Sequence, residues 1–396
     1  MIIKPEFHTF ALTALVGSMG ALLASLLNVP APFLSGPALA VTITGLAGVK
    51  LGIPAFIRNA CFVVVGISMG TSVTPSVIDA AKTWPLSFVI VLVAVVIMLY
   101  VAYWILHYGF GYDRTTAMLG ASPGHLSYII SLGAETKSDL ATVSIVQSVR
   151  VLALTLSVPL IVEYFDLVST EPLIANPPMG LFTLALTIGA SLAMGWLFLR
   201  WRFPAALLLG GVAVSIGTHI TGLTEGGVPS WLSLPVYVLI GCLIGTRFSN
   251  VSLMDVRKGF LAGFVVTIAV MVIAGSIAWM ISNITGVPLN AVMIAYSPGG
   301  LETMAAMAVM MHADTPMSAH ITFSDFCSCR FSCRSSWARM HASGTAKSKP
   351  GQCPRHSGKK RQWRCNHLFL WPFMFLRNCG GDFSRVRQAD PPEDYS

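Results

Sequence analysis

The stretch MLGASPGHLSYII, residues 118–130, interrupts an apolar segment with Ser-Pro-Gly, and MIAYSPGGLE at residues 293–302 does the same in the second half of the chain. Proline lacks a backbone N–H and glycine adopts unusual dihedral angles, so each pair breaks a helix and frees backbone polar groups. In hydrocarbon, such groups are tolerated only where protein or a water-filled cavity meets them. We therefore expect two matching breaks inside a helical membrane protein.

The composition supports a membrane location. Of the 396 residues, 54% are hydrophobic and 11% are charged, whereas a soluble domain carries about a quarter charged residues. This excludes an ordinary soluble enzyme. Further apolar segments approach the roughly 17–25 residues that cross a bilayer. They lie at about 7–27, 33–49, 56–72, 85–107, 140–161, 179–199, 204–221, 232–248 and 258–282.

One constant shift in residue number, the shift that carries Ser122 onto Ser297, superposes features along most of the chain. The other aligned pairs include Gly66 and Gly241, Gly70 and Gly245, Pro54 and Pro229, Asp139 and Asp314, and Met19-Gly20 and Met194-Gly195. We therefore predict two copies of one unit, at residues 7–161 and 179–322. The GxxxG spacing of the paired glycines predicts close packing between helices.

The basic residues indicate how the copies are oriented. If both Ser-Pro-Gly segments enter the membrane and return, each copy has five spans and the second copy is inverted. The cytoplasmic side then carries nearly every basic residue outside the spans, and Lys82 alone lies opposite, as the positive-inside rule expects. If both segments crossed fully, Lys137, Arg200, Arg202, Arg247, Arg257 and Lys258 would lie opposite Lys50 and Arg58. The predicted fold is an all-α, polytopic helical bundle with two inverted repeats and Pro-Gly re-entrant breaks.

Inverted repeats with matching breaks point to a solute or ion site near the membrane midplane. Arg150 lies about midway along its apolar segment, with Gln147 one turn earlier, and a central arginine needs a partner. Glu302, Asp139 and the freed carbonyls are candidates, and both an anion-binding role and a clamp on those carbonyls stay open. His125 could relay protons or be structural. The predicted substrate-binding residues are Ser122, Pro123, Gly124, His125, Gln147, Arg150, Ser297, Pro298, Gly299, Gly300 and Glu302.

We predict no catalytic residue, no metal site and no cofactor. The histidines before residue 323 show no HxxxH or ExxH spacing, and Cys61 and Cys242 are isolated. No GxxxxGK[ST] motif for ATP occurs. The expected partners are the lipid bilayer and a small-molecule solute, not nucleic acid, and a homo-oligomer stays open.

Residues 323–396 break the pattern. Residues 1–322 carry 12 Lys+Arg and 12 Asp+Glu, whereas residues 323–396 carry 13 and 5. Asp325 stands where the shift predicts a counterpart of Arg150. Reading the codons of Ser324–Arg334 from their third base permits an arginine and a proline at the spacing of Arg150 and Pro159. Our hypothesis is a frameshift near residue 323, with a metal-binding or basic interaction tail as the alternative. Resequencing codons 315–335 distinguishes the two, because an unbroken frame would exclude the frameshift.

The segment Gly120–Leu126, through Asp139 to Gln147–Arg150, resembles the AbrB family of bacterial inner-membrane proteins, and so does its second copy at Ser297–Glu302 and Ala313–Asp314. The resemblance covers about residues 10–322. It implies a duplicated, multi-pass inner-membrane protein, and the family's usual labels are ammonia monooxygenase and AbrB family regulator. We expect a secondary transporter or permease for a small solute, an anion being one candidate. A membrane protein that regulates gene expression is the alternative, and an ammonia monooxygenase is the third.

Overall fold

Helices make up the fold. The computed structural model describes residues 5–71, 84–122, 129, 133, 138–164, 177–201, 203, 205–249, 253–285, 289, 292–293 and 301–310. These all belong to one compact unit, Met1–Gly344. Among them there is no strand, and Pro178 and Gly227 form one isolated β-bridge. The all-helical class predicted from the sequence is therefore confirmed.

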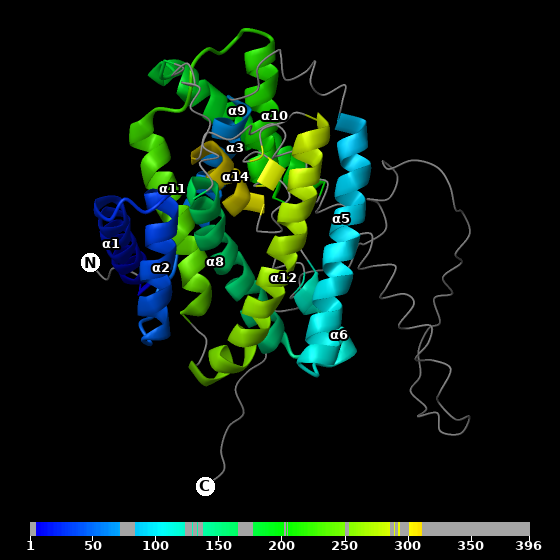
Figure 1. The fold of residues 1–396 in the computed structure, drawn as a ribbon. Helices are drawn as coiled ribbons and strands as arrows, with labels where there is room; N and C mark the ends of the chain where they lie inside the picture. Colours follow the sequence, from blue (N-terminus) through cyan, green and yellow to red (C-terminus); the bar gives the residue numbers. More distant parts are fainter. Residues whose placement is uncertain are drawn as a thin grey trace, which may run out of the picture. The chain divides into compact units, whose positions relative to one another are not determined.

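Figure 1 shows the order of the helices. The first half of the chain forms α1 (Pro5–Leu26), α2 (Pro32–Leu46), α3 (Ala55–Gly70), α5 (Trp84–Trp104) with the π-helical turn η2 (Ile105–Gly109), α6 (Arg114–Ala121) and α8 (Leu140–Tyr164). The second half forms α9 (Leu181–Arg200), α10 (Ala206–Ile220), α11 (Ser230–Gly245) with the short turn η3 (Thr246–Phe248), α12 (Leu253–Thr285) and α14 (Leu301–Met310).

Every apolar segment predicted from the sequence corresponds to one of these helices. In the described part of the chain, five helices are long and apolar enough to cross a membrane: Phe7–Leu26, Leu140–Tyr164, Leu181–Arg200, Ser230–Phe248 and Gly259–Ile284. Four shorter apolar helices accompany them: Pro32–Leu46, Ala55–Gly70, Val93–Gly109 and Ala206–Ile220. The lengths and composition of these helices are consistent with a helical membrane protein.

Helices of the two halves correspond in their bounds and ends. The shift that carries Gly66 onto Gly241 also carries both ends of α3 onto both ends of α11, and it carries α2 onto α10 to within one position at each end. Prolines precede α3 and α11 with nearly identical dihedral angles, φ −58° and ψ 142° at Pro54 and φ −59° and ψ 142° at Pro229. Alanines in the left-handed region precede α2 and α10, with φ 50° at Ala31 and 47° at Ala205. Since left-handed alanine is strained, its recurrence within one position of the expected counterpart is informative.

The paired glycines lie where helices of opposite halves meet. A Cβ atom at Gly66 in α3 would collide with Leu208 O in α10, and one at Gly241 in α11 would collide with Leu34 O in α2. Residue 208 is itself within one position of the counterpart of residue 34. One turn on, Gly70 faces Ser215 and Gly245 faces Val41. The GxxxG pairs are therefore packing positions, as their spacing predicts.

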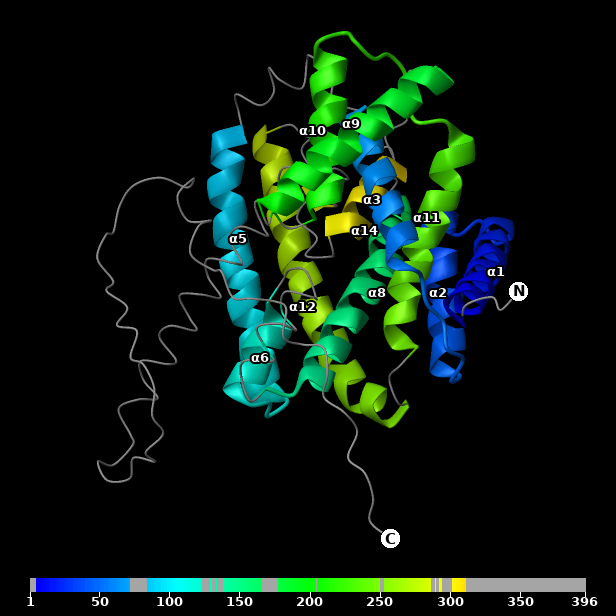
Figure 2. The same cartoon turned by 180° about the vertical axis from the view of Figure 1, so that it is seen from behind.

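Two large hydrophobic clusters hold the helices together. The first joins α3, α8, α11 and α14, with Val65, Leu154, Ile240 and Met304 among its members. The second joins α5, α6, α8 and α12, with Ala102, Ala117, Val146 and Ala262 among its members. Because α8 contributes to both clusters, it connects the break-bearing side of the first half to the rest. Helix α12 runs alongside α8, and α5 lies against α12 (Figures 1 and 2).

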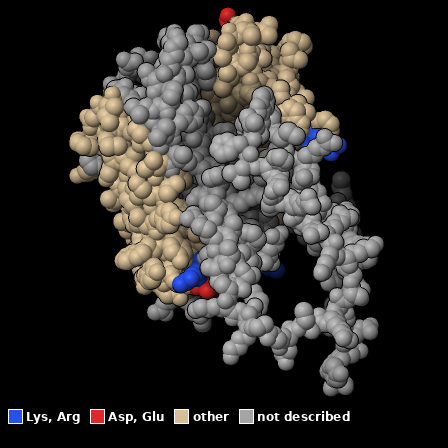
Figure 3. Space-filling model, turned by 90° about the vertical axis from the view of Figure 1, so that its right-hand side faces the viewer, with Lys and Arg blue, Asp and Glu red and all other residues tan. Residues whose placement is uncertain are grey.

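The outer surface is apolar. Phe56 is 82% exposed, Phe182 84% and Trp196 67%, and many leucines and isoleucines on α1, α9 and α12 are exposed beside them. In the face drawn in Figure 3, charged side chains lie at the edges of the described surface. Soluble monomers rarely expose apolar patches of this extent, whereas a bilayer covers them.

Candidate functional site

Helix α6 ends at the first break. Asp113 caps its N-terminus by accepting a hydrogen bond from Thr115 N at 3.1 Å, and Ser122 at its C-terminus is extended, with φ −63° and ψ 120°. Ser122 precedes Pro123, and the residue before a proline is disfavoured in the helical region. The break predicted from the sequence therefore begins at Ser122. Pro123, Gly124 and His125 lie outside the described residues.

Gln147 and Arg150 of α8 hold the end of α6. Gln147 Nε2 donates to Leu119 O at 2.9 Å and to Ser122 O at 3.1 Å. Arg150 Nη1 donates to Ala121 O and Nη2 donates to Ser122 O, both at 3.2 Å. Gln147, Arg150 and Ser122 are each at most 2% exposed. The two side chains named together in the sequence prediction thus act together, on the carbonyls at the break.

These hydrogen bonds give the buried carbonyl oxygens at the end of α6 their partners. The last carbonyls of a helix have no partner within the helix, and burying a carbonyl without a partner costs about 1–3 kcal/mol. A guanidinium also carries positive charge to the negative end of the helix dipole. Of the partners predicted for Arg150, the structure shows the carbonyls. Asp139 instead caps α8, accepting from Ala141 N at 3.1 Å and Thr142 N at 3.2 Å.

The segment that contains the first break, residues 116–139, is called the first break segment, and its two ends lie close together. Asp139 N donates to Thr116 Oγ1 at 3.1 Å, so the residue before α8 lies beside the first turn of α6. At the other end of α6, Ser122 is level with Arg150 in the middle of α8. Ile129 is buried with Leu119 and Val143 between these points. Sequence reasoning missed Thr116, because no periodicity indicates which α6 hydroxyl lies beside Asp139.

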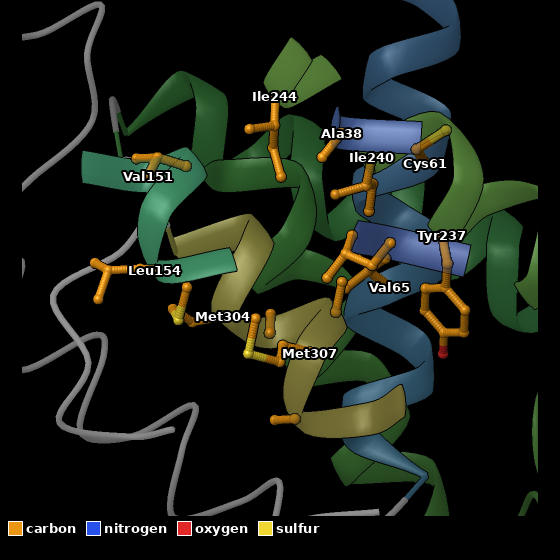
Figure 4. Close-up of a cluster of buried hydrophobic side chains, with 14 of the residues drawn as sticks. Ala38, Cys61, Val65, Val151, Leu154, Tyr237, Ile240, Ile244, Met304 and Met307 are labelled. Carbon is orange, nitrogen blue, oxygen red and sulfur yellow. The ribbon is translucent and has the colours of Figure 1, made fainter. Parts of the chain in front are cut away.

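For the second break, the structure describes the residues on its C-terminal side. Ser297, Pro298, Gly299 and Gly300 lie outside the described residues, and α14 begins directly after them at Leu301. Glu302 lies in its first turn, with its side chain outside the described part. Residues 303–308 are all at most 4% exposed. Met304 and Met307 contact the first hydrophobic cluster beside Leu154 and Val65 (Figure 4).

Helix α6, which ends at the first break, is less than half the length of a span. At 1.5 Å per residue, its 8 residues are about 12 Å long. A hydrocarbon core is about 30 Å thick. Met304 packs against the same cluster as Val151 of α8, one residue after Arg150 (Figure 4). The start of α14 and the end of α6 are therefore both linked to the middle of α8.

Two aspartates, which cap the N-termini of α6 and α8, have lowered pKa values. The side-chain hydrogen bond from Thr142, followed by backbone N–H donors, lowers the pKa of Asp139 below its ordinary value of 3.8. The hydrogen bond from Thr115 lowers the pKa of Asp113 in the same way. Both act as ionised caps. Within the described part of the chain, no group of three or more His, Cys, Asp and Glu could hold a metal ion.

Comparison with known proteins shows to which family the chain belongs. Residues 33–321 match the family described as "Transition state regulatory protein AbrB". The chain belongs to the AbrB family. The match spans both breaks as well as Gln147 and Arg150 of α8, and so confirms the resemblance found in the sequence.

Two curated proteins are similar to this AbrB-family chain at low identity. "Putative regulator AbrB" of Escherichia coli (strain K12) is 26% identical over 296 residues, which cover 72% of this chain and 83% of that protein. "Uncharacterized protein YhjN" of Bacillus subtilis (strain 168) is 26% identical over 273 residues, covering 64% and 70%. No solved structure matches the chain.

Proposed function

We propose that this AbrB-family protein is a secondary transporter or permease for a small solute in the inner membrane of a bacterium. The observation that carries the proposal is the short helix α6, which ends at the first Ser-Pro-Gly break and is held there by Gln147 and Arg150 in the middle of α8. Irregular backbone at membrane depth marks solute sites in transporters built from inverted repeats. The protein is not proposed to be an enzyme.

The proposal includes two inverted repeats. The matching bounds of α3 and α11 and of α2 and α10 support the duplication. Inversion is supported by contacts between loops that the full-crossing layout would place on opposite sides. Ser249 Oγ donates to Leu51 O at 2.9 Å and accepts from Leu51 N at 3.3 Å. With both breaks re-entrant, these two loops share the cytoplasmic side.

Two further contacts support the same layout. The hydrogen bond between Asp139 and Thr116 joins the two ends of the first break segment, which full crossing would separate by the thickness of the membrane. Asn28, after α1, and Leu160, near the end of α8, line one surface pocket. Both residues lie on the outer side of the membrane if the first break segment is re-entrant. They lie on opposite sides of the membrane if that segment crosses it.

The proposed solute site comprises Ser122, Pro123, Gly124, His125, Gln147 and Arg150 from the first half and Ser297, Pro298, Gly299, Gly300 and Glu302 from the second. Within it, Arg150 positions the end of α6. The guanidinium of Arg150 and the positive end of the α14 helix dipole both favour an anionic solute.

A flux measurement tests this function. The full chain is reconstituted in liposomes, and uptake of radiolabelled succinate, glutamate, phosphate and sulfate is measured as a panel. We expect saturable uptake of at least one anion, abolished by Gly124→Leu and retained in Gly189→Leu, because a Cβ at Gly189 would contact nothing within 4 Å. Absence of flux for the whole panel, with altered transcript levels on deletion of the gene, would instead support the regulatory role that the Escherichia coli relative's name carries.

A further inference from the structure

His219 lies in the last turn of α10, outside the proposed solute site, and both of its ring nitrogens face carbonyl oxygens. Nδ1 is 2.8 Å from Ser215 O, in the preceding turn of the same helix. Nε2 is 3.0 Å from Gly226 O, in the loop between α10 and α11. A carbonyl oxygen only accepts hydrogen bonds, so each nitrogen needs its own hydrogen.

In the hydrogen-bond network of the structure, the neighbouring hydroxyls donate to other oxygens. Thr224 Oγ1 lies 3.1 Å from Nδ1 but donates its hydrogen to Thr218 Oγ1 at 2.8 Å. Thr218 Oγ1 in turn donates to Ser215 O at 3.2 Å. Thr224 therefore presents a lone pair to the ring. A neutral imidazole has one N–H, and would leave the other nitrogen facing oxygen lone pairs.

The loop that His219 reaches is tied to a third segment. Gly227 N donates to Pro177 O at 3.0 Å, and Met179 N donates to Gly227 O at 2.9 Å. Residues 177–179 lead directly into α9. Through Gly226 and Gly227, His219 thus connects the end of α10 to the starts of α11 and α9.

Among the described residues, the segments that contact the ring carry no charged side chain except Glu225. The segments 215–224, 226–230 and 177–179 contain no Asp, Glu, Lys or Arg. Glu225 is in the same loop and exposed, and the described residues show no ion pair between it and His219. Of the helices packed against α10, α3 carries Arg58 in its first turn and α9 carries Arg200 in its last, both at the ends away from His219.

Two general properties make this position suited to a charge switch. The C-terminal end of the α10 dipole favours a positive ring. Histidine is the side chain that ordinarily changes charge between about pH 5 and 8. A change of charge on the ring would therefore alter its hydrogen bonds to Ser215 O and Gly226 O.

We propose that His219 is a proton-operated clamp. Its doubly protonated ring fastens the α10–α11 loop to the end of α10, and loss of one proton releases one of the two carbonyls and loosens the pairing of residues 226–227 with residues 177–179. The layout proposed above places this loop on the outer side of the membrane, where it would sense external pH. The clamp itself does not depend on transport.

Two measurements on the full chain in lipid nanodiscs test the clamp. The first is the 15N spectrum of histidine-labelled protein, with the His219 signals assigned by their loss in His219→Gln. We expect both ring nitrogens to be protonated at about pH 5.5 and one at about pH 8. A neutral His219 ring at about pH 5.5, with the loop still paired, would overturn the proposal.

The second measurement is hydrogen exchange of the Met179 and Gly227 amides. After correction for intrinsic rates, we expect exchange to be about tenfold faster at about pH 8 than at about pH 5.5, because a charge-assisted hydrogen bond is lost. His219→Arg should remove this pH dependence, since arginine stays charged. His107→Gln is the matched control, because His107 bonds a single carbonyl, Tyr112 O at 2.8 Å. Equal exchange at both pH values in the wild-type protein would contradict the clamp, even if the variants do not fold.

Discussion

Arg150 shows what a single buried charge does in this fold. Its depth in an apolar segment predicts a partner, and the structure shows its guanidinium donating to the carbonyl end of α6. The sequence leaves three candidates because the choice depends on how deep α6 ends relative to α8, which no spacing within one helix encodes. Gln147 could be predicted, since it lies one turn away on the same face.

Arg150→Met should destabilise the protein by about 1–3 kcal/mol, because Ala121 O loses its side-chain partner in a buried environment. Thermal unfolding in detergent measures the change. The stability of Arg150→Lys should lie between that of the wild type and that of Arg150→Met, since an ammonium group cannot reproduce the paired geometry of the guanidinium. A methionine variant as stable as the wild type would contradict the clamping role.

Asp139→Ala should cost about 1 kcal/mol at neutral pH, because an N-cap of α8 is lost. The pKa of Asp139 is lowered in the folded state, so its ionised cap stabilises the fold above the ordinary value of 3.8. That stabilisation is lost as the pH falls through the lowered pKa. Unfolding curves of variant and wild type should therefore converge below about pH 4. A difference that is constant across this range would exclude the ionised cap.

At the scale of the helix, the glycines explain why α3 and α10 cross so closely. The GxxxG spacing predicts close packing, and the contacts of Gly66 and Gly241 confirm it. The partner helix could not be predicted, because a glycine pair shows that some backbone approaches but not which one. In both cases it belongs to the opposite half of the chain.

Gly66→Leu and Gly241→Leu should destabilise the fold by similar amounts, at least the roughly 1–3 kcal/mol typical of overpacking, since each new side chain would meet backbone of the neighbouring helix. Gly189→Leu in α9 is the control, because its position is exposed and a Cβ there has no neighbour. Size-exclusion profiles and melting temperatures in detergent measure the effect. A strong effect at one glycine and none at the other would argue against equivalent helix pairs.

At the scale of the whole molecule, hydropathy was sufficient to find every apolar helix, because span length is imposed by the bilayer. The short helix α6 was foreseen only as an interruption. Its depth depends on tertiary contacts, such as the hydrogen bond between Asp139 and Thr116. The clamp at His219 has no sequence signature, since it depends on how the α10–α11 loop folds back. The AbrB family match ends at residue 321, next to the predicted frameshift near residue 323, which stays a prediction.

The inverted layout is the central claim, and cysteine accessibility in intact cells tests it most directly. Single cysteines at Lys82, Lys137 and Asp166, in a chain with its native cysteines replaced, are treated with a membrane-impermeant maleimide. The account predicts labelling at positions 82 and 166 from outside and protection at position 137. Labelling of position 137 from outside would show that the first Ser-Pro-Gly segment crosses the membrane, and would contradict the layout.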